Sequence, residues 1–358
     1  MSAAVQAETQ EPEVLSRIEG RAGVITLNRP RALNSLNLEM IREMMRALKE
    51  WESDPQVDFV LVESGSDRAF CAGGDIRSVY LARLEGKRDY KDAIFREEYQ
   101  LNYYISRYPK PYVSLINGIC MGGGMGISIH GRYRVVTDKT VMAMPETGIG
   151  FFPDVGGSYF LNRCPGQMGM FMAITGEKIT AGDAMYAGLA THYVPSSKID
   201  ALRSALIAIQ DTAELENVLN RHKEAAPPSD LSAVQPLIDD IFDGKTVDEI
   251  LEKLYAAKHP KAYDWLRSLA KKSPMSMTIA FTLLKKTKEM SLKKCLPIEY
   301  RLSQRFVEHY DFFEGIRALL VDKDNEPKWQ PQHVSQVKTA EVREYFKNLG
   351  TRELILGS

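Results

Sequence analysis

Two glycine-rich segments determine the fold of this chain: AFCAGGD at residues 69–75 and GICMGGGMG at residues 118–126. Each follows a short apolar run, Phe59–Val62 and Tyr112–Ile116, typical of strands that are buried on both faces. Small residues and paired glycines allow backbone N–H groups to approach a ligand closely, and an oxyanion hole needs two such donors. The alternative is that the glycines only make tight turns. A dinucleotide-binding loop is a weak alternative for the second segment, because its glycines do not follow the G-x-G-x-x-G spacing.

The chain around these segments alternates between strands and helices. We expect strands at residues 21–28, 59–62, 112–116, 133–136 and 141–144, and helices at 38–51, which Asn37 would cap, and 90–108. The alternation over residues 20–200 predicts an α/β fold with parallel strands, because hairpins cannot hold so many intervening helices. After Asp200 the pattern is almost entirely helical, with a linker at residues 225–230.

Composition and charge exclude several classes of protein. The 358 residues include 46 Lys plus Arg and 47 Asp plus Glu, so the net charge of −1 offers no overall basic field to nucleic acid or to a membrane surface. No apolar run approaches the ~20 residues that span a bilayer. The four cysteines are widely separated and the six histidines lack metal-ligand spacing, which argues against disulfides or a metal site and favours a reducing compartment. The acidic start of the chain is expected to be a flexible leader.

A third segment, PETGIGFFPDVGG at residues 145–157, carries two carboxylates among apolar residues. The surrounding phenylalanines should raise the pKa values of Glu146 and Asp154 and suit them to act as a base or a nucleophile. The alternative is that Asp154 caps a helix and Glu146 lies on the surface. Cys71 is interpreted as a buried core residue rather than a nucleophile. The lysines between 271 and 294 are a solvated helix face or attract the phosphates of a ligand.

The three segments together resemble the crotonase (enoyl-CoA hydratase/isomerase) superfamily. Further matching blocks are Asn28-Arg29-Pro30 with Leu33-Asn34-Ser35-Leu36, and the resemblance covers roughly residues 15 to 345. It implies a spiral of ββα turns with a helical C-terminal region. We therefore expect a leader at 1–14, a spiral core at 15–225 and a helical region at 226–358 that packs on the core.

Within that superfamily the chain looks like the 3-hydroxyisobutyryl-CoA hydrolase family. The stretches that carry this resemblance are 95–99, 144–147 and 152–157, and, in the tail, 299–304, 322–324 and 328–329. The resemblance implies hydrolysis of 3-hydroxyisobutyryl-CoA, and also of 3-hydroxypropionyl-CoA, in valine catabolism. Coenzyme A would be part of the substrate, and no other cofactor or metal is expected.

The resemblance also implies roles for individual residues. The thioester oxygen would lie between the N–H groups of Ala72 and Gly123, with Glu146 and Asp154 as catalytic groups. The remaining substrate contacts would come from Glu98, Gly73, Gly74, Asp75 and Gly122, and the adenine and pantetheine part would lie along residues 28–36 and 72–75. Ordinary hydratases carry a second glutamate two residues after the triple glycine, where this chain has Gly126.

Two other functions remain open at this point. One is an enoyl-CoA hydratase or isomerase, which the missing glutamate disfavours. The other is a non-catalytic acyl-CoA-binding protein, which would not need the carboxylate pair. We expect a cytoplasmic location in a bacterium, or an organellar matrix in a eukaryote, and the sequence leaves the oligomeric state open.

Overall fold

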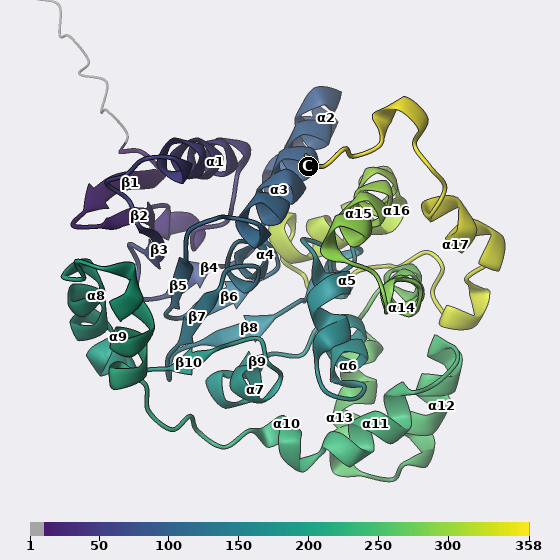
Figure 1. The fold of residues 1–358 in the computed structure, drawn as a ribbon. Helices are drawn as coiled ribbons and strands as arrows, with labels where there is room; N and C mark the ends of the chain where they lie inside the picture. The colour runs from purple at the N-terminus through teal and green to yellow at the C-terminus, as the bar shows by residue number, and fades with distance from the viewer. Residues whose placement is uncertain (1–10, 358) are drawn as a thin grey trace, which may run out of the picture.

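Two β-sheets form the N-terminal half of the molecule (Figure 1). The computed structural model describes residues 11–357. A six-stranded sheet has the order β1 (Val14–Glu19), β2 (Ala22–Leu27), β3 (Phe59–Ser64), β5 (Tyr112–Ile116), β7 (Tyr133–Val136) and β10 (His192–Tyr193). A four-stranded sheet has the order β4 (Ala69–Cys71), β6 (Ile119–Met121), β8 (Val141–Ala143) and β9 (Ile179–Thr180).

The chain winds between the two sheets as a spiral. In each of the pairs β3/β4, β5/β6 and β7/β8, the first strand joins the large sheet and the second joins the small one. The helices α2 (Ile76–Leu84), α3 (Arg88–Ser106) and α4 (Gly123–Ile129) follow the first two pairs. The predicted α/β spiral is therefore confirmed, and both glycine-rich segments follow strands of the small sheet at the same edge.

The expectation of parallel strands is wrong for two pairs. β1 and β2 form an antiparallel hairpin, and β8 pairs with β9 antiparallel. Residues 1–10 of the expected leader lie outside the described residues, while Val14, its last residue, already pairs with Leu27 in the sheet. The remaining predicted strands occur within one or two residues of their expected ends.

Helix α1 (Leu38–Glu52) forms as the sequence predicts. The Asn37 side chain accepts a hydrogen bond from the Met40 N–H, which satisfies one of the unpaired donors at the start of the helix. Apolar residues at helical spacing, Ile41, Met44 and Leu48 among them, are buried.

The second half of the chain is helical, as expected. Its helices are α8 (Ile199–Ile207), α9 (Leu215–His222), α10 (Asp230–Ala233), α11 (Gln235–Phe242), α12 (Val247–Ala256), α13 (Pro260–Leu269), α14 (Pro274–Thr287), α15 (Leu292–Phe306), α16 (Tyr310–Ile316) and α17 (Thr339–Tyr345). Residues 225–229 of the predicted linker lie between α9 and α10, where no helix or strand forms, while Asp230 already begins α10. α14 and α15 pack on α5 (Gly157–Phe160), α6 (Met168–Thr175) and α3 of the core (Figure 1), so the tail completes the walls around the third segment. Among residues 11–357, no helix combines the length and the apolar character needed to cross a membrane.

Candidate active site

Three carboxylates from separate elements are buried close to the glycine turns. Glu98 comes from α3, Glu146 begins the 3₁₀ turn η2 (Glu146–Ile149) after β8, and Asp154 lies in the loop before α5. Their exposed fractions are only 4%, 7% and 6%. Gly156, not Asp154, is the N-cap of α5. The alternative of a surface glutamate and a capping aspartate is therefore wrong.

The triple glycine brings two of these carboxylates to the turn that precedes α4. A methyl group added to Gly122 would come within 2.6 Å of Glu146 Oε1, and one added to Gly123 within 2.6 Å of Glu98 Oε1 and 3.1 Å of the Gly74 nitrogen. A methyl group on Gly124 would meet the Cys71 carbonyl oxygen at 2.3 Å. Each glycine is thus needed because another functional or backbone group occupies the space of a side chain.

The assignment of the backbone donors needs one correction. The N–H of Ala72 donates to the Leu33 carbonyl at 3.0 Å, so it is not free to face a thioester. The N–H groups of Gly74 and Gly123 meet no acceptor within residues 11–357, and the two glycines lie side by side. Gly73 adopts a φ of 123°, which only glycine tolerates readily, and the Gly74 nitrogen lies 3.1 Å from a methyl group built on Gly123. The expectation for Gly123 stays, and Gly74 replaces Ala72 as the candidate second donor.

Asp75 is also used differently from what we expected. Its carboxylate caps α2 by accepting from the Ser78 N–H at 3.1 Å, and it pairs with Arg29 at 2.9 Å. These contacts hold the glycine turn against the loop at residues 28–36. Asp75 therefore shapes the turn, while Gly122 lies against the Glu146 carboxylate and Gly73 and Gly74 lie beside Gly123.

Aromatic side chains keep water away from the carboxylates, as the sequence indicated. The ring centroids of Phe151 and Phe152 are 4.7 Å apart, and both rings pack against Phe306 of α15. Burial raises the pKa of Glu146 well above its usual range, and the nearby charge of Asp154 raises it further.

The other two carboxyls respond to the same environment. Burial raises the pKa of Asp154 to about 7. The Tyr99 hydroxyl opposes this rise, because it donates to Asp154 Oδ2 at 2.7 Å and favours the ionised form. Burial and the charge of Asp154 raise the pKa of Glu98. The charge of Asp154 therefore disfavours the ionised forms of both Glu98 and Glu146, so the three acids titrate as a coupled group.

Position 126, where hydratases carry their second glutamate, has no room for one. A methyl group on Gly126 would lie 2.6 Å from Val155 Cβ and 3.0 Å from Asn102 Nδ2. Asn102 is itself fully buried, and neither atom of its amide has a hydrogen-bond partner among the described residues. The pocket therefore replaces a second glutamate by the Val155 side chain and an amide.

The Asp154 loop is held in a strained conformation by two distant residues. Val155 has a φ of 51°, which a β-branched residue rarely adopts. His130 Nε2 lies 2.8 Å from the Val155 carbonyl oxygen, and because a carbonyl only accepts, Nε2 carries the proton. Glu299 of α15 accepts from the Gly156 and Ser158 N–H groups at 2.7 and 3.0 Å. These contacts fix the backbone on either side of Asp154.

Three residues of the site were not identified from the sequence: Tyr99, Asn102 and Glu299. Lys272 was considered only as one of the lysines that are solvated or attract phosphates. Asn102 follows Glu98 at helical spacing, which could have placed both on one face of α3. Lys272 lies within 3.3 Å of methyl groups built on Gly148 and Gly176, and its charge favours the ionised form of Glu146. Glu299 is a lone acid within the apolar stripe of α15, a pattern that marks a buried and paired charge.

Among the described residues, neither the Cys71 thiol nor a cluster of metal-ligating side chains is positioned to take part in catalysis. Cys71 is fully buried, as expected, and burial raises the pKa of its thiol. Within residues 11–357, no group of three or more His, Cys, Asp or Glu side chains is arranged to hold a metal ion.

Comparison with known proteins identifies the class. The chain belongs to the enoyl-CoA hydratase/isomerase family, whose model matches residues 22–346. It is 45% identical to a 3-hydroxyisobutyryl-CoA hydrolase, mitochondrial, of Danio rerio over 96% of this chain and 92% of that protein. The protein of the same name from Homo sapiens is 43% identical, over 96% of this chain and 90% of that one.

Two solved structures share the fold over nearly the whole chain. One, titled a carnitinyl-CoA dehydratase from Mycobacterium thermoresistibile, has a TM-score of 0.91 and 41% identity, with 96% of this chain and 98% of that chain covered. The other, titled an enoyl-CoA hydratase from Rhodobacter sphaeroides 2.4.1, has a TM-score of 0.90 and 37% identity, with 96% and 100% covered. The relatives therefore carry names from two reaction classes, hydrolysis and hydration.

Proposed function

We propose that this chain hydrolyses the thioester of 3-hydroxyisobutyryl-CoA, releasing CoA and the free hydroxy acid. One observation carries the proposal: the buried carboxylates of Glu98 and Glu146 lie at the glycine turn that carries the Gly123 N–H, while position 126 has no room for the second base of a hydratase. The names of the hydrolases from Danio rerio and Homo sapiens support the same substrate and its place in valine catabolism.

The first step is polarisation of the thioester. Its carbonyl oxygen would accept from the N–H groups of Gly74 and Gly123, which stabilise the negative charge as the carbon becomes tetrahedral. Removing one such donor costs about 10²–10³-fold in turnover elsewhere. Because the site is largely dry, these bonds are stronger than they would be in water.

Glu146 is the group proposed to attack or to activate water. In one route its carboxylate displaces CoA and forms a mixed anhydride, which water then hydrolyses. In the other route it removes a proton from the water that attacks the thioester directly. Burial makes the ionised carboxylate more basic, and the ammonium of Lys272 favours that ionised form, which suits either route.

Asp154 and Glu98 are proposed to hold the hydroxyl group of the substrate. A carboxyl that stays protonated can donate to this hydroxyl while an ionised one accepts from it. A site with buried polar groups rejects an acyl chain that lacks the hydroxyl, because those groups would lose their partner. One missing methyl group matters less, so 3-hydroxypropionyl-CoA is proposed as a second substrate.

The rest of CoA is proposed to lie over the loop at residues 28–36 and the turn at residues 72–75. The exposed Arg31 lies in this loop, and the exposed Arg77 lies in the first turn of α2, two residues after the glycine turn. Neither forms an ion pair among the described residues, so both are available to phosphate groups. No cofactor beyond the CoA of the substrate is proposed. For location, we propose the cytoplasm of a bacterium or an organellar matrix, and the mitochondrial names of the relatives support the second.

The test compares three thioesters: 3-hydroxyisobutyryl-CoA, isobutyryl-CoA and crotonyl-CoA. We expect release of free thiol from the hydroxylated substrate, much slower release from isobutyryl-CoA, and no loss of the crotonyl ultraviolet absorbance. Equal turnover of the two saturated substrates would remove the role of Asp154 and Glu98. Hydration of crotonyl-CoA without thiol release would replace the hydrolase by the hydratase alternative.

A single turnover in heavy-oxygen water tests the anhydride route for Glu146. Label that enters the Glu146 carboxylate indicates an anhydride that water opens at the Glu146 carbon. An anhydride opened at the acyl carbon and a general base both place the label only in the released acid. Rapid acid quenching followed by mass spectrometry separates these two cases, because only the anhydride route leaves the acyl group bound to the protein.

A further inference from the structure

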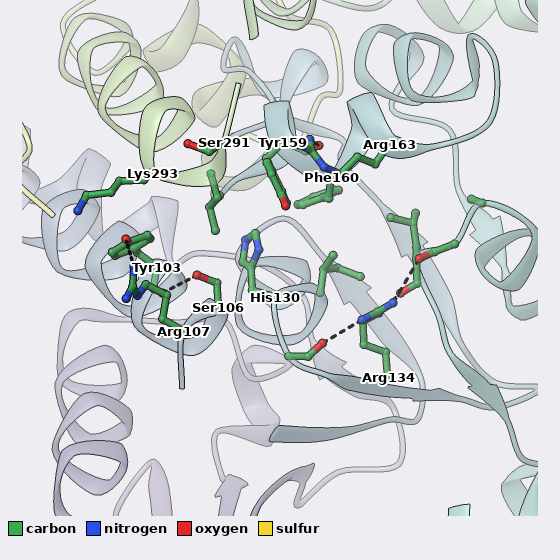
Figure 2. Close-up of a pocket in the computed structure, with 16 residues that line it drawn as sticks. Tyr103, Ser106, Arg107, His130, Arg134, Tyr159, Phe160, Arg163, Ser291 and Lys293 are labelled. Atoms are coloured by element: carbon green, nitrogen blue, oxygen red, sulfur yellow. Dashed lines mark hydrogen bonds between the residues drawn. The ribbon is translucent and has the colours of Figure 1, made fainter. Parts of the chain in front are cut away.

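A second cavity lies behind the Asp154 loop, apart from the carboxylate site. It has a volume of about 590 Å³, and its walls come from the ends of α3 and α4, from β7, from α5 with the turn that follows it, and from the start of α15 (Figure 2). None of the residues proposed to contact the substrate lines it. His130 forms part of its wall, so the cavity is one side chain away from the Val155 carbonyl of the Asp154 loop.

The charge of this cavity is its distinguishing property. Arg107, Arg134, Arg163 and Lys293 all line it, and no Asp or Glu does. In the part of the chain that the structure describes, none of these four cations forms an ion pair with a carboxylate, although the whole chain has a net charge of only −1. Arginines elsewhere, such as Arg42 with Glu97 and Arg203 with Glu63, are paired.

Neutral groups hold these cations in place. Arg134 donates to three backbone carbonyls, those of Gly131, Gly188 and Leu189. Arg163 donates to the Tyr159 and Met290 carbonyls. These contacts fix the positions of the guanidinium groups without neutralising their charge.

Two tyrosine rings complete this arrangement (Figure 2). Arg163 Cζ lies 3.4 Å from the ring centre of Tyr159. Arg107 donates to the Tyr103 hydroxyl at 3.1 Å, and Lys293 Nζ lies 5.8 Å from the centre of the same ring. Like charges gathered in one concave surface repel one another, and an anion that enters relieves this repulsion.

We propose that this cavity, here called the basic pocket, binds a small anion of the diphosphate class. Guanidinium groups bind phosphate oxygens through paired hydrogen bonds, and the ammonium of Lys293 adds a point charge. The volume lies in the range of small-molecule sites, and the apolar side chains of Ile129, Phe160 and Leu292 offer a surface for an organic part. Both a free nucleoside diphosphate and the diphosphate of a second CoA molecule have this chemistry.

The test is calorimetric titration of the full chain with sodium pyrophosphate at constant ionic strength. The variant Arg107→Gln/Lys293→Gln removes two charges from the basic pocket. Its matched control, Lys245→Gln/Lys261→Gln, removes two charges from exposed positions outside the basic pocket and outside residues 271–294. We expect one saturable site in the native chain and the control, and at least about tenfold weaker binding in the pocket variant.

A second variant keeps the test independent of any change in stability. Ser291→Glu places a carboxylate at the rim of the basic pocket and should also abolish pyrophosphate binding, because it occupies the site with a fixed anion. Its folded state is checked by circular dichroism. Absence of saturable binding to the native chain, or equal affinity of the native chain and both pocket variants, would overturn the proposal.

Titrations with ADP and with CoA distinguish the two sources. If CoA is the occupant, the native chain takes up two equivalents of CoA and the Arg107→Gln/Lys293→Gln variant takes up one. If a free nucleotide is the occupant, both proteins bind one equivalent of CoA, and only the native chain binds ADP in competition with pyrophosphate.

Discussion

Replacing Glu299 by glutamine should disturb the Asp154 loop without touching the substrate. Glu299 is fully buried, and its Oε2 accepts from the Gly156 N–H while its Oε1 accepts from the N–H and hydroxyl of Ser158. A glutamine that keeps its oxygen on Ser158 turns an NH₂ group toward the Gly156 N–H. Two donors then face each other, and one buried N–H is left unpaired.

The magnitude follows from that unpaired group. A buried donor without a partner costs about 1–3 kcal/mol, so the free energy of unfolding should fall by that amount in Glu299→Gln. Glu299→Ala leaves both the Gly156 and Ser158 N–H groups unpaired, and should cost about 2–6 kcal/mol. Val155 would also lose support for its positive φ, a conformation that costs about 1–3 kcal/mol. Asp154 should then leave its productive position.

The assay combines urea unfolding with steady-state kinetics on 3-hydroxyisobutyryl-CoA. We expect kcat to fall at least about tenfold in Glu299→Gln. The affinity for CoA, measured as the inhibition constant of free CoA, should change less. The control is Glu289→Gln, an exposed residue just before α15, which should change the unfolding free energy by less than about 0.5 kcal/mol. Equal stability and equal kcat in the two variants would refute the role of Glu299 in holding the loop.

Three further predictions concern the same pocket. Gly126→Glu should not create a hydratase, because even the Cβ of the new side chain would lie 2.6 Å from Val155 Cβ. We expect the free energy of unfolding to fall by about 1–3 kcal/mol, and Gly126→Ala should show the same loss. Hydration of crotonyl-CoA by Gly126→Glu would contradict this prediction. Stability should depend on the protons that the folded site binds. The folded pKa of Asp154 and of Glu299 is about 7, above the values of 3.8 and 4.5 of the free groups, so the folded state binds more protons and these groups make stability fall as pH rises from about 4 to 7. Asp154→Asn should flatten this fall in urea midpoints, and an unchanged pH profile would count against the buried acid cluster. Asn102→Leu should raise KM for the hydroxylated substrate more than for isobutyryl-CoA if its unpaired amide meets the hydroxyl, and equal changes would show a packing role only.

Local patterns in the sequence predicted much of the fold. Helix α1 was predicted from the apolar spacing of residues 38–51 and from the capping side chain of Asn37. Both features are local, because each depends only on residues within one or two turns of the helix. The continuous apolar runs gave β3 and β5 because strands covered on both faces contain few polar residues. β1 was missed, because this edge strand is mostly exposed and its residues Ser16 and Arg17 hide the apolar pattern.

The site was predictable in its residue types but not in its backbone geometry. Glu146 and Asp154 were found because carboxylates among phenylalanines are unusual, and the structure confirms their burial. The choice between Ala72 and Gly74 depends on which N–H already has an acceptor, and the bond from Ala72 to the Leu33 carbonyl joins two segments that only folding brings together. Glu299 contacts Gly156 from 143 residues away, so only the folded chain shows what the tail does for the Asp154 loop.

The most direct test of the account is the rate of thiol release from 3-hydroxyisobutyryl-CoA by the native chain and by Glu146→Gln. The matched control is Glu289→Gln, an exposed glutamate just before α15 that has no proposed role. We predict that the native chain and the control release CoA at similar rates, and that Glu146→Gln loses about 10²–10⁴-fold in kcat while still binding free CoA. Native-like thiol release by Glu146→Gln would contradict the central claim that the buried Glu146 carboxylate hydrolyses the thioester.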